Sequence, residues 1–69
     1  MSLQLRRINL AAGDEYYVRY RDGCRAVYLV EGSCSPLKYA KPITIMEGHM
    51  VKVVAREASI IGVFGVPKP

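Results

Sequence analysis

Residues of high β-propensity fill six short runs in this chain, each bounded by glycine, proline or aspartate, and apolar residues at helical spacing are scarce. The runs predict strands over residues 3–10, 15–21, 24–31, 43–46, 50–56 and 59–66. The longest connection is "GSCSPLKYAKP", residues 32–42. The sequence therefore predicts an all-β chain with six strands and one long loop.

The two halves of the chain resemble each other. A shift of 35 residues aligns "AGDEYYVRYRDGC" with "EGHMVKVVAREAS" and matches Gly13 with Gly48, Val18 with Val53, and Arg21 with Arg56. Few positions are identical, so a duplicated unit and ordinary β-patterning both explain the match. In either case each half supplies a three-stranded meander, and two meanders predict a small six-stranded β-sandwich or barrel.

The length of the chain limits its core. We expect a single β-domain over residues 1–69, and a domain of roughly 60 residues buries only about 60% of the surface that its unfolded chain exposes. Stabilisation by a partner or by further copies is therefore expected. Apolar runs such as residues 60–66 fall short of the roughly 20 residues that cross a bilayer, so no membrane contact is expected. No secretory signal follows the first methionine, so we expect a cytoplasmic location, although a mature secreted chain that had lost its leader would look the same.

Charge and cysteine content leave few chemical functions. A net charge of +4 suits a polyanionic partner, but surplus basic residues also keep small domains in solution. Cys24 and Cys34 are not spaced as zinc ligands, and His49 is the one histidine that could join them. Neither His49 nor the scattered carboxylates predict a catalytic pair. We expect a protein that is not an enzyme and that uses no metal, cofactor or small-molecule substrate.

The dipeptide Asp22-Gly23 is a favoured two-residue hairpin turn. A hairpin there would pair residues 15–21 with residues 24–31 and place Tyr17 opposite Tyr28. One face would then be the core face. Its members are Tyr16, Val18, Tyr20, Val27 and Leu29.

The other face of that hairpin would carry Tyr17 and Tyr28 beside Arg19 and Arg21. Three roles fit it. It could be an ordinary solvated surface, a protein interface, since tyrosine and arginine are enriched there, or a stacking platform for single-stranded nucleic acid.

The last strand, "SIIGVFGV", offers apolar residues to both of its faces. In so short a chain only one face can meet the core, so we expect the strand to associate with other copies through Ile61, Val63 and Val66. Pro67 begins a predicted extended arm over residues 67–69, because proline cannot continue a hydrogen-bonded ladder.

The alternation "AAGDEYYV … YLVEG … PITIMEGHMVKVVA" resembles small jelly-roll or cupin-like β-domains. In size, basicity and apolar edge the chain is similar to the small decoration, or cement, proteins of tailed-phage virions. Enzymatic cupins bind metal through several histidines and a glutamate, and one histidine cannot supply that set. The resemblance therefore implies a binding or structural role, as a symmetric oligomer seated on a larger assembly.

We therefore expect a structural or assembly protein that acts by protein–protein contact, most specifically a virion decoration subunit. One alternative is a basic nucleic-acid-binding β-barrel, and another is a phage-encoded inhibitor of a host protein. The predicted contact residues are Tyr17, Arg19, Arg21, Tyr28, Ile61, Val63, Val66 and Pro67. The nucleic-acid alternative would use Arg6, Arg7, Arg19, Arg21 and Arg25.

Overall fold

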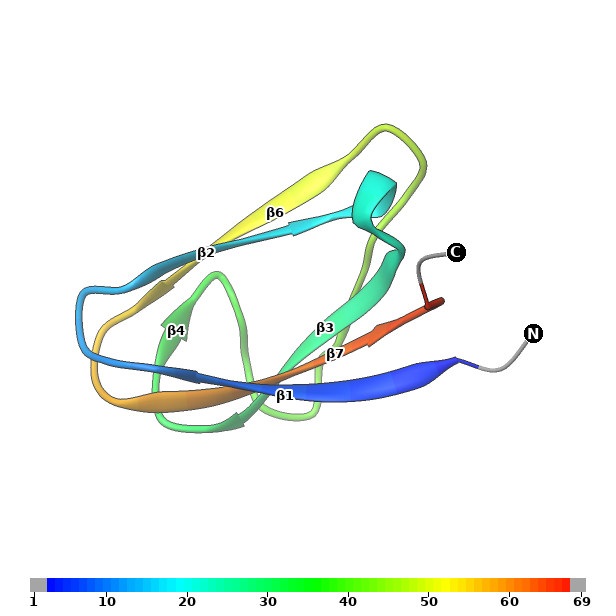
Figure 1. The fold of residues 1–69 in the computed structure, drawn as a ribbon. Coiled ribbons are helices and arrows are strands. Elements are labelled where there is room, and N and C mark those ends of the chain that lie inside the picture. The colour runs from blue at the N-terminus through cyan, green and yellow to red at the C-terminus, as the bar shows by residue number, and fades with distance from the viewer. Residues whose placement is uncertain (1–2, 68–69) are drawn as a thin grey trace.

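Two antiparallel β-sheets lie one above the other in the computed structural model, which describes residues 3–67 (Figure 1). One sheet has four strands in the order β1-β7-β3-β5, and the other has three in the order β2-β6-β4. A single turn of 3-10 helix, η1 (Tyr20–Asp22), follows β2. The strands are β1 (Gln4–Leu10), β2 (Glu15–Arg19), β3 (Cys24–Glu31), β4 (Cys34–Ser35), β5 (Ile43–Thr44), β6 (Met50–Ala55) and β7 (Ser59–Gly65).

The all-β prediction is confirmed, and the predicted strand over residues 24–31 coincides with β3. The count of six strands is not exact, and the fold is a sandwich rather than a closed barrel. The additional strand is β4, which lies inside the predicted loop 32–42 and pairs with β6 through Cys34 and Ser35. A strand of two residues is too short to show an alternating pattern in the sequence. It forms because the neighbouring strand β6 supplies its hydrogen-bonding partners.

The predicted hairpin at Asp22-Gly23 is wrong. Strand β2 pairs with β6, and β3 pairs with β7 and β5. The chain instead turns through η1, where the Gly23 N–H donates to the Tyr20 carbonyl at 2.9 Å and Gly23 has a φ of 93°. This turn carries the chain from one sheet to the other, so the residues on its two sides do not face each other across a ladder. Glycine is suited to the turn because φ is positive there.

The predicted meanders are also wrong, because neighbouring strands come from different halves of the chain. From β1 to β5 the four-stranded sheet alternates between the first and second halves, and β2 of the first half pairs with β6 of the second. The shift of 35 residues superposes β1, β2 and β3 on β5, β6 and β7. When each strand of the four-stranded sheet is replaced by its equivalent, the order β1-β7-β3-β5 becomes β5-β3-β7-β1, which is the same order counted from the other edge. The two halves are therefore interlocked about an approximate internal two-fold axis, with registers that differ by one residue between the ladders β1–β7 and β3–β5, and β4 has no counterpart among the described strands.

Hydrogen bonds at the turns before β2 and β6 follow the same symmetry. The Asp14 N–H donates to the Ala11 carbonyl at 3.0 Å, and the His49 N–H donates to the Met46 carbonyl at 2.9 Å. Gly13 and Gly48 have φ angles of 89° and 78°. The weak internal match in the sequence thus corresponds to two turns of the same construction.

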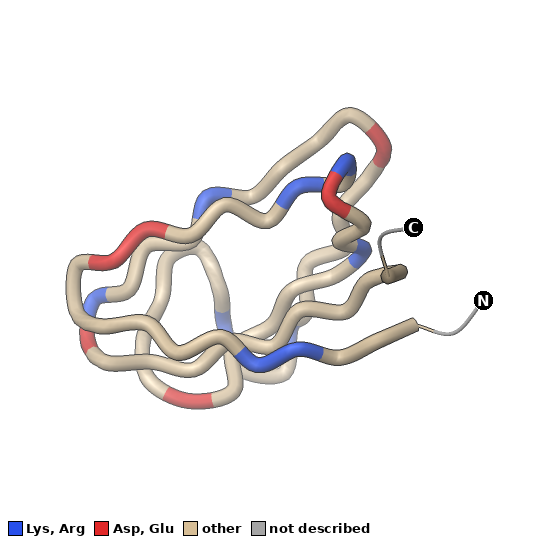
Figure 2. The backbone as a smooth tube through the Cα atoms, in the orientation of Figure 1, with Lys and Arg blue, Asp and Glu red and all other residues tan. Residues whose placement is uncertain are grey.

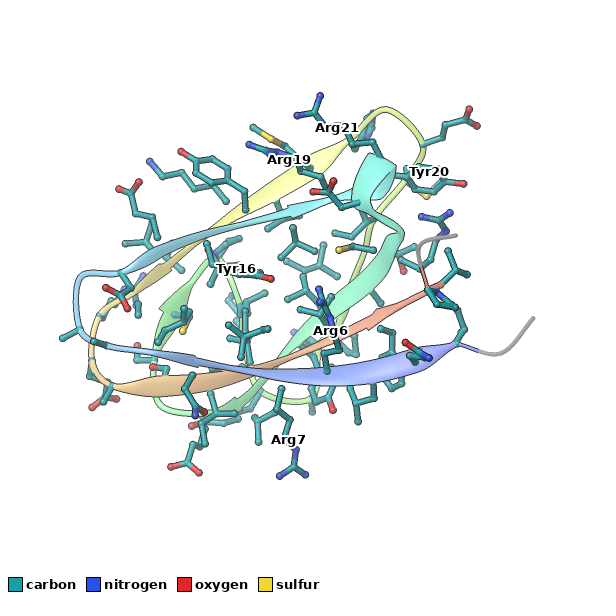
Figure 3. The ribbon with its side chains drawn as sticks, viewed as in Figure 1. Arg6, Arg7, Tyr16, Arg19, Tyr20 and Arg21 are labelled. Atoms are coloured by element: carbon teal, nitrogen blue, oxygen red, sulfur yellow. The ribbon has the colours of Figure 1, made fainter. Side chains whose placement is uncertain are left out.

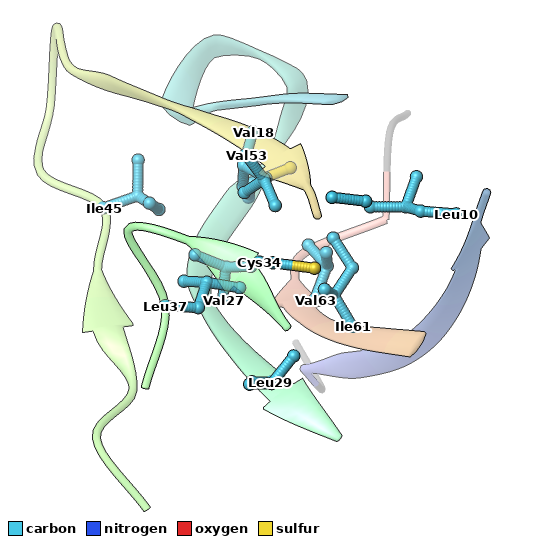
Figure 4. Packing of buried hydrophobic residues seen from close by; sticks show 12 residues of the cluster. Leu10, Val18, Val27, Leu29, Cys34, Leu37, Ile45, Val53, Ile61 and Val63 are labelled. Atoms are coloured by element: carbon cyan, nitrogen blue, oxygen red, sulfur yellow. The ribbon is translucent and has the colours of Figure 1, made fainter. Parts of the chain in front are cut away.

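The core is one cluster drawn from both sheets (Figure 4). Of the predicted core face, Val18, Val27 and Leu29 are buried, and Tyr16 and Tyr20 pack against the cluster while partly exposed. Cys24 and Cys34 are both buried as free thiols. The remaining buried members are Leu10, Leu37, Ile45, Val53, Ala55, Ile61 and Val63.

Candidate interaction surface

Tyr17 and Tyr28, predicted to form a cross-strand pair, lie on different sheets. Tyr17 is on β2 opposite Lys52, and Tyr28 is on β3 opposite Gly62. The prediction fails because the hairpin that would have paired these strands does not form. The predicted surface of tyrosines and arginines therefore separates into two parts on opposite layers of the sandwich.

The arginines of that predicted surface stay near η1 (Figure 3). The Arg19 guanidinium carbon lies 5.3 Å from the centre of the Tyr17 ring, and Arg21 is exposed on η1. Arg25, which was assigned to the nucleic-acid alternative, lies 3.7 Å above the Tyr20 ring and donates to the Tyr20 and Cys24 carbonyls at 2.9 and 3.1 Å. Arg25 therefore has a structural role, since it ties η1 to the start of β3.

The other residues predicted for an apolar interface lie on β7 or after it. Ile61 and Val63 are buried in the core of this chain, so the prediction that they contact another molecule is wrong. They point inward because alternate residues of a strand face opposite sides of the sheet. Val66 is partly buried and Pro67 is exposed. The rest of the predicted arm, residues 68–69, lies outside the described residues.

The arginines of the nucleic-acid alternative do not form one basic stripe (Figure 2). Arg6 points toward the three-stranded sheet and Arg7 points away from it, although they are neighbours on β1 (Figure 3). Arg19 is on β2 in the other layer. A backbone of phosphates follows a continuous positive surface, and these three side chains do not line one.

An exposed apolar cluster, which the sequence pattern alone did not reveal, covers the outer side of the four-stranded sheet. Leu5 on β1 pairs with Phe64 on β7, and their exposed fractions are 46% and 36%. The Phe64 ring stacks on Tyr28 of β3, with ring centres 5.7 Å apart and planes 28° apart. Ile60, two residues before Gly62, faces the same side and is partly exposed. We call Leu5, Tyr28, Ile60 and Phe64 the aromatic face.

Gly62 forms the floor of the aromatic face. It pairs with Tyr28, and a Cβ atom at position 62 would collide with carbons of the Tyr28 ring. The ring therefore lies across the glycine backbone, close to the sheet. A glycine inside a strand commonly marks such a close approach. The result is a low, flat apolar surface in which the tyrosine ring has a defined position.

Two charged residues flank the aromatic face. Arg7 on β1 lies in register with Gly62, and Glu31 at the end of β3 pairs with Ile60. Both are exposed, and within residues 3–67 neither forms an ion pair. By contrast, the Lys52 ammonium lies 3.4 Å from the Glu15 carboxylate on the three-stranded sheet. The aromatic face thus has one unpaired charge of each sign at its edges.

Two hollows lie elsewhere on the molecule. One, of about 390 Å³, opens near the start of β1 and is lined in part by Arg6, Cys24 and Val63. The other, of about 430 Å³, lies beside η1 and is lined in part by Arg21 and His49. No group of three His, Cys, Asp or Glu side chains in the described part of the chain is placed to hold a metal ion. We take the aromatic face as the candidate site because it gathers exposed apolar side chains and a stacked aromatic pair from three adjacent strands.

Comparison with protein-family models, curated proteins and solved structures found no match to this chain. Across residues 3–67 there is no helix of the length and hydrophobicity that spanning a membrane requires.

Proposed function

We propose that this protein is a non-enzymatic module that acts by protein–protein contact and that the aromatic face is its contact surface. The observation that supports this most directly is the stack of Tyr28 on Phe64 beside Leu5, exposed on the outer side of the four-stranded sheet. Full burial of a side chain such as leucine or phenylalanine stabilises a complex by about 1.5–3 kcal/mol. Because Leu5 and Phe64 are 46% and 36% exposed, association through this face would contribute the corresponding part of that free energy for each side chain.

The geometry of the aromatic face favours a macromolecular partner. Three adjacent strands, β1, β7 and β3, present it as one surface, and the two hollows described above are lined by other residues. Because Gly62 keeps the Tyr28 ring close to the sheet, little side-chain freedom is lost when a flat partner binds. Aromatic residues with arginine nearby are also enriched at protein interfaces.

The most specific form of this proposal is a structural subunit that attaches to a larger assembly, as its resemblance to virion decoration proteins implies. An inhibitor that covers a host protein with the same face is a second form. The nucleic-acid alternative has less support, since Arg6 and Arg7 point to opposite sides of their sheet. Its signature would be an affinity for single-stranded oligonucleotide whose logarithm falls linearly with the logarithm of salt concentration.

Photo-crosslinking tests the proposal. The photoreactive residue p-benzoylphenylalanine would replace Phe64, and in a matched control it would replace Met50, which is 54% exposed on the other sheet. Irradiation in the cells that make the protein should link position 64, and not position 50, to a protein. If position 64 yields no protein adduct, or an adduct with nucleic acid, the proposal is wrong.

A further inference from the structure

We propose that the aromatic face binds a second copy of this chain, so that two four-stranded sheets pack face to face about a two-fold axis, with Arg7 of each copy against Glu31 of the other. This inference rests on the proposed function and names its partner. It assigns a role to two exposed charges that form no ion pair within residues 3–67.

The positions of Arg7 and Glu31 make the aromatic face complementary to itself. Arg7 is on the edge strand β1 and Glu31 is on β3, with β7 between them. Strand β5 pairs with β3 only at Ala26 and Val27, so β3 is itself an edge at Glu31. The two charges therefore lie on opposite borders of the apolar cluster.

A two-fold axis in the plane of the interface exchanges those borders. If the axis runs between Arg7 and Glu31, each arginine of one copy meets the glutamate of the other, and the pairing occurs twice because the contact is isologous. The same rotation places the stacked rings of Tyr28 and Phe64 in one copy opposite the same two rings in the other copy. Sheets that pack in this way are about 10 Å apart, with apolar side chains between them.

Charge also favours a second copy over an unrelated basic or acidic partner. The chain carries a net charge of +4, yet the border of the aromatic face presents both signs. A strongly acidic partner would meet Glu31 unfavourably, and a strongly basic partner would meet Arg7 unfavourably. A second copy presents its Glu31 to Arg7 and its Arg7 to Glu31, so both charges meet a charge of opposite sign.

Charge exchange combined with sedimentation equilibrium tests this arrangement. Arg7→Glu and Glu31→Arg should each weaken dimerisation by about tenfold or more, because each places like charges together at two symmetric points. The double variant R7E/E31R should restore an affinity close to that of the unchanged protein. Recovery in the double variant also shows that neither substitution prevents folding.

Matched controls separate local pairing from net charge. Arg21→Glu on η1 and Glu47→Arg in the turn before β6 change the net charge by the same amounts at exposed positions that line the hollow beside η1, away from the aromatic face. They should leave the dimerisation constant unchanged within about threefold, since exposed charges farther from the contact than the Debye length are largely screened at physiological salt. Equal effects of Arg21→Glu and Arg7→Glu would overturn the predicted pairing.

The crosslink at position 64 distinguishes this inference from the proposed function. An adduct with twice the mass of the chain supports both. An adduct with a different protein, from a chain that sediments as a monomer, keeps the proposed function and overturns the second copy. A dimer that R7E/E31R does not restore overturns the pairing of Arg7 with Glu31 across the two-fold axis.

Discussion

Val18 and Val53, which lie 35 positions apart, are both completely buried, on the adjacent strands β2 and β6. In the ladder Val18 is opposite Val51, and Val53 is opposite Tyr16, so the two valines occupy exchanged positions about the internal two-fold axis. Each fills the core from its own half of the chain. The symmetry is therefore present in packing as well as in strand order.

This equivalence predicts matched losses of stability. Val18→Ala and Val53→Ala should each lower the free energy of unfolding by about 2–3 kcal/mol, because each removes two buried methyl groups and leaves a cavity. Urea denaturation checks the values. Val54→Ala is the control: this partly exposed neighbour of Val53 should lose less than about 1 kcal/mol, and a larger loss there would contradict the assigned faces.

The two symmetric turns predict a second pair of matched losses of stability. Gly13→Ala and Gly48→Ala should each cost about 1–2 kcal/mol, because both glycines have positive φ and an added Cβ would meet nothing within 4 Å. The loss thus comes from backbone conformation alone. Asparagine tolerates this region better, so Gly13→Asn and Gly48→Asn should lose less in thermal unfolding. Alanine variants as stable as the unchanged protein would refute the argument.

The contact between Gly62 and Tyr28 predicts a strong coupling. Gly62→Ala should destabilise the protein by about 1–3 kcal/mol, because the added methyl displaces the tyrosine ring. In the background of Tyr28→Ser the same change should have little effect, since no ring remains to displace. Denaturant unfolding of the four proteins in this double-mutant cycle measures the coupling. Additive effects would show that the ring does not limit position 62.

The contacts of Arg25 predict that replacing it with lysine lowers stability more than the same replacement at an exposed arginine. Arg25→Lys should lower the free energy of unfolding by about 1 kcal/mol, because an ammonium group cannot reproduce both the stacking on Tyr20 and the hydrogen bonds to two carbonyls. The matched change Arg21→Lys, on an exposed residue of η1, should alter stability by less than about 0.5 kcal/mol. Thermal melts of both variants provide the comparison, and equal losses would count against the role assigned to Arg25.

Local pattern was sufficient to predict where most strands occur and insufficient to predict how they pair. The run at residues 24–31 has strong β-propensity along its whole length, and it coincides with β3. Its partners are set by packing between distant segments, which a two-residue signal such as Asp22-Gly23 does not encode. The turn residues were recognised, but a glycine with positive φ ends η1 and joins two sheets as readily as it closes a hairpin.

For the candidate surface, the prediction included Tyr28 of β3 and the strand β7, but on β7 it chose the inward residues Ile61 and Val63. Alternation along "SIIGVFG" places Ile60, Gly62 and Phe64 on one side and Ile61 and Val63 on the other. Which side is buried depends on the position of β7 in the sheet. Because β7 is an inner strand between β1 and β3, its outward residues join those of two neighbours to form the aromatic face.

The interlocked halves have a consequence for synthesis of the chain. Strand β1 has no hydrogen-bonded neighbour until β7 is available, and β2 has none until β6 is available. During synthesis the first half can therefore complete none of its final ladders by itself, because every strand pair joins strands from different halves of the chain. Folding depends on pairing between segments about half the chain apart, and β7 must leave the ribosome before it can join β1 and β3.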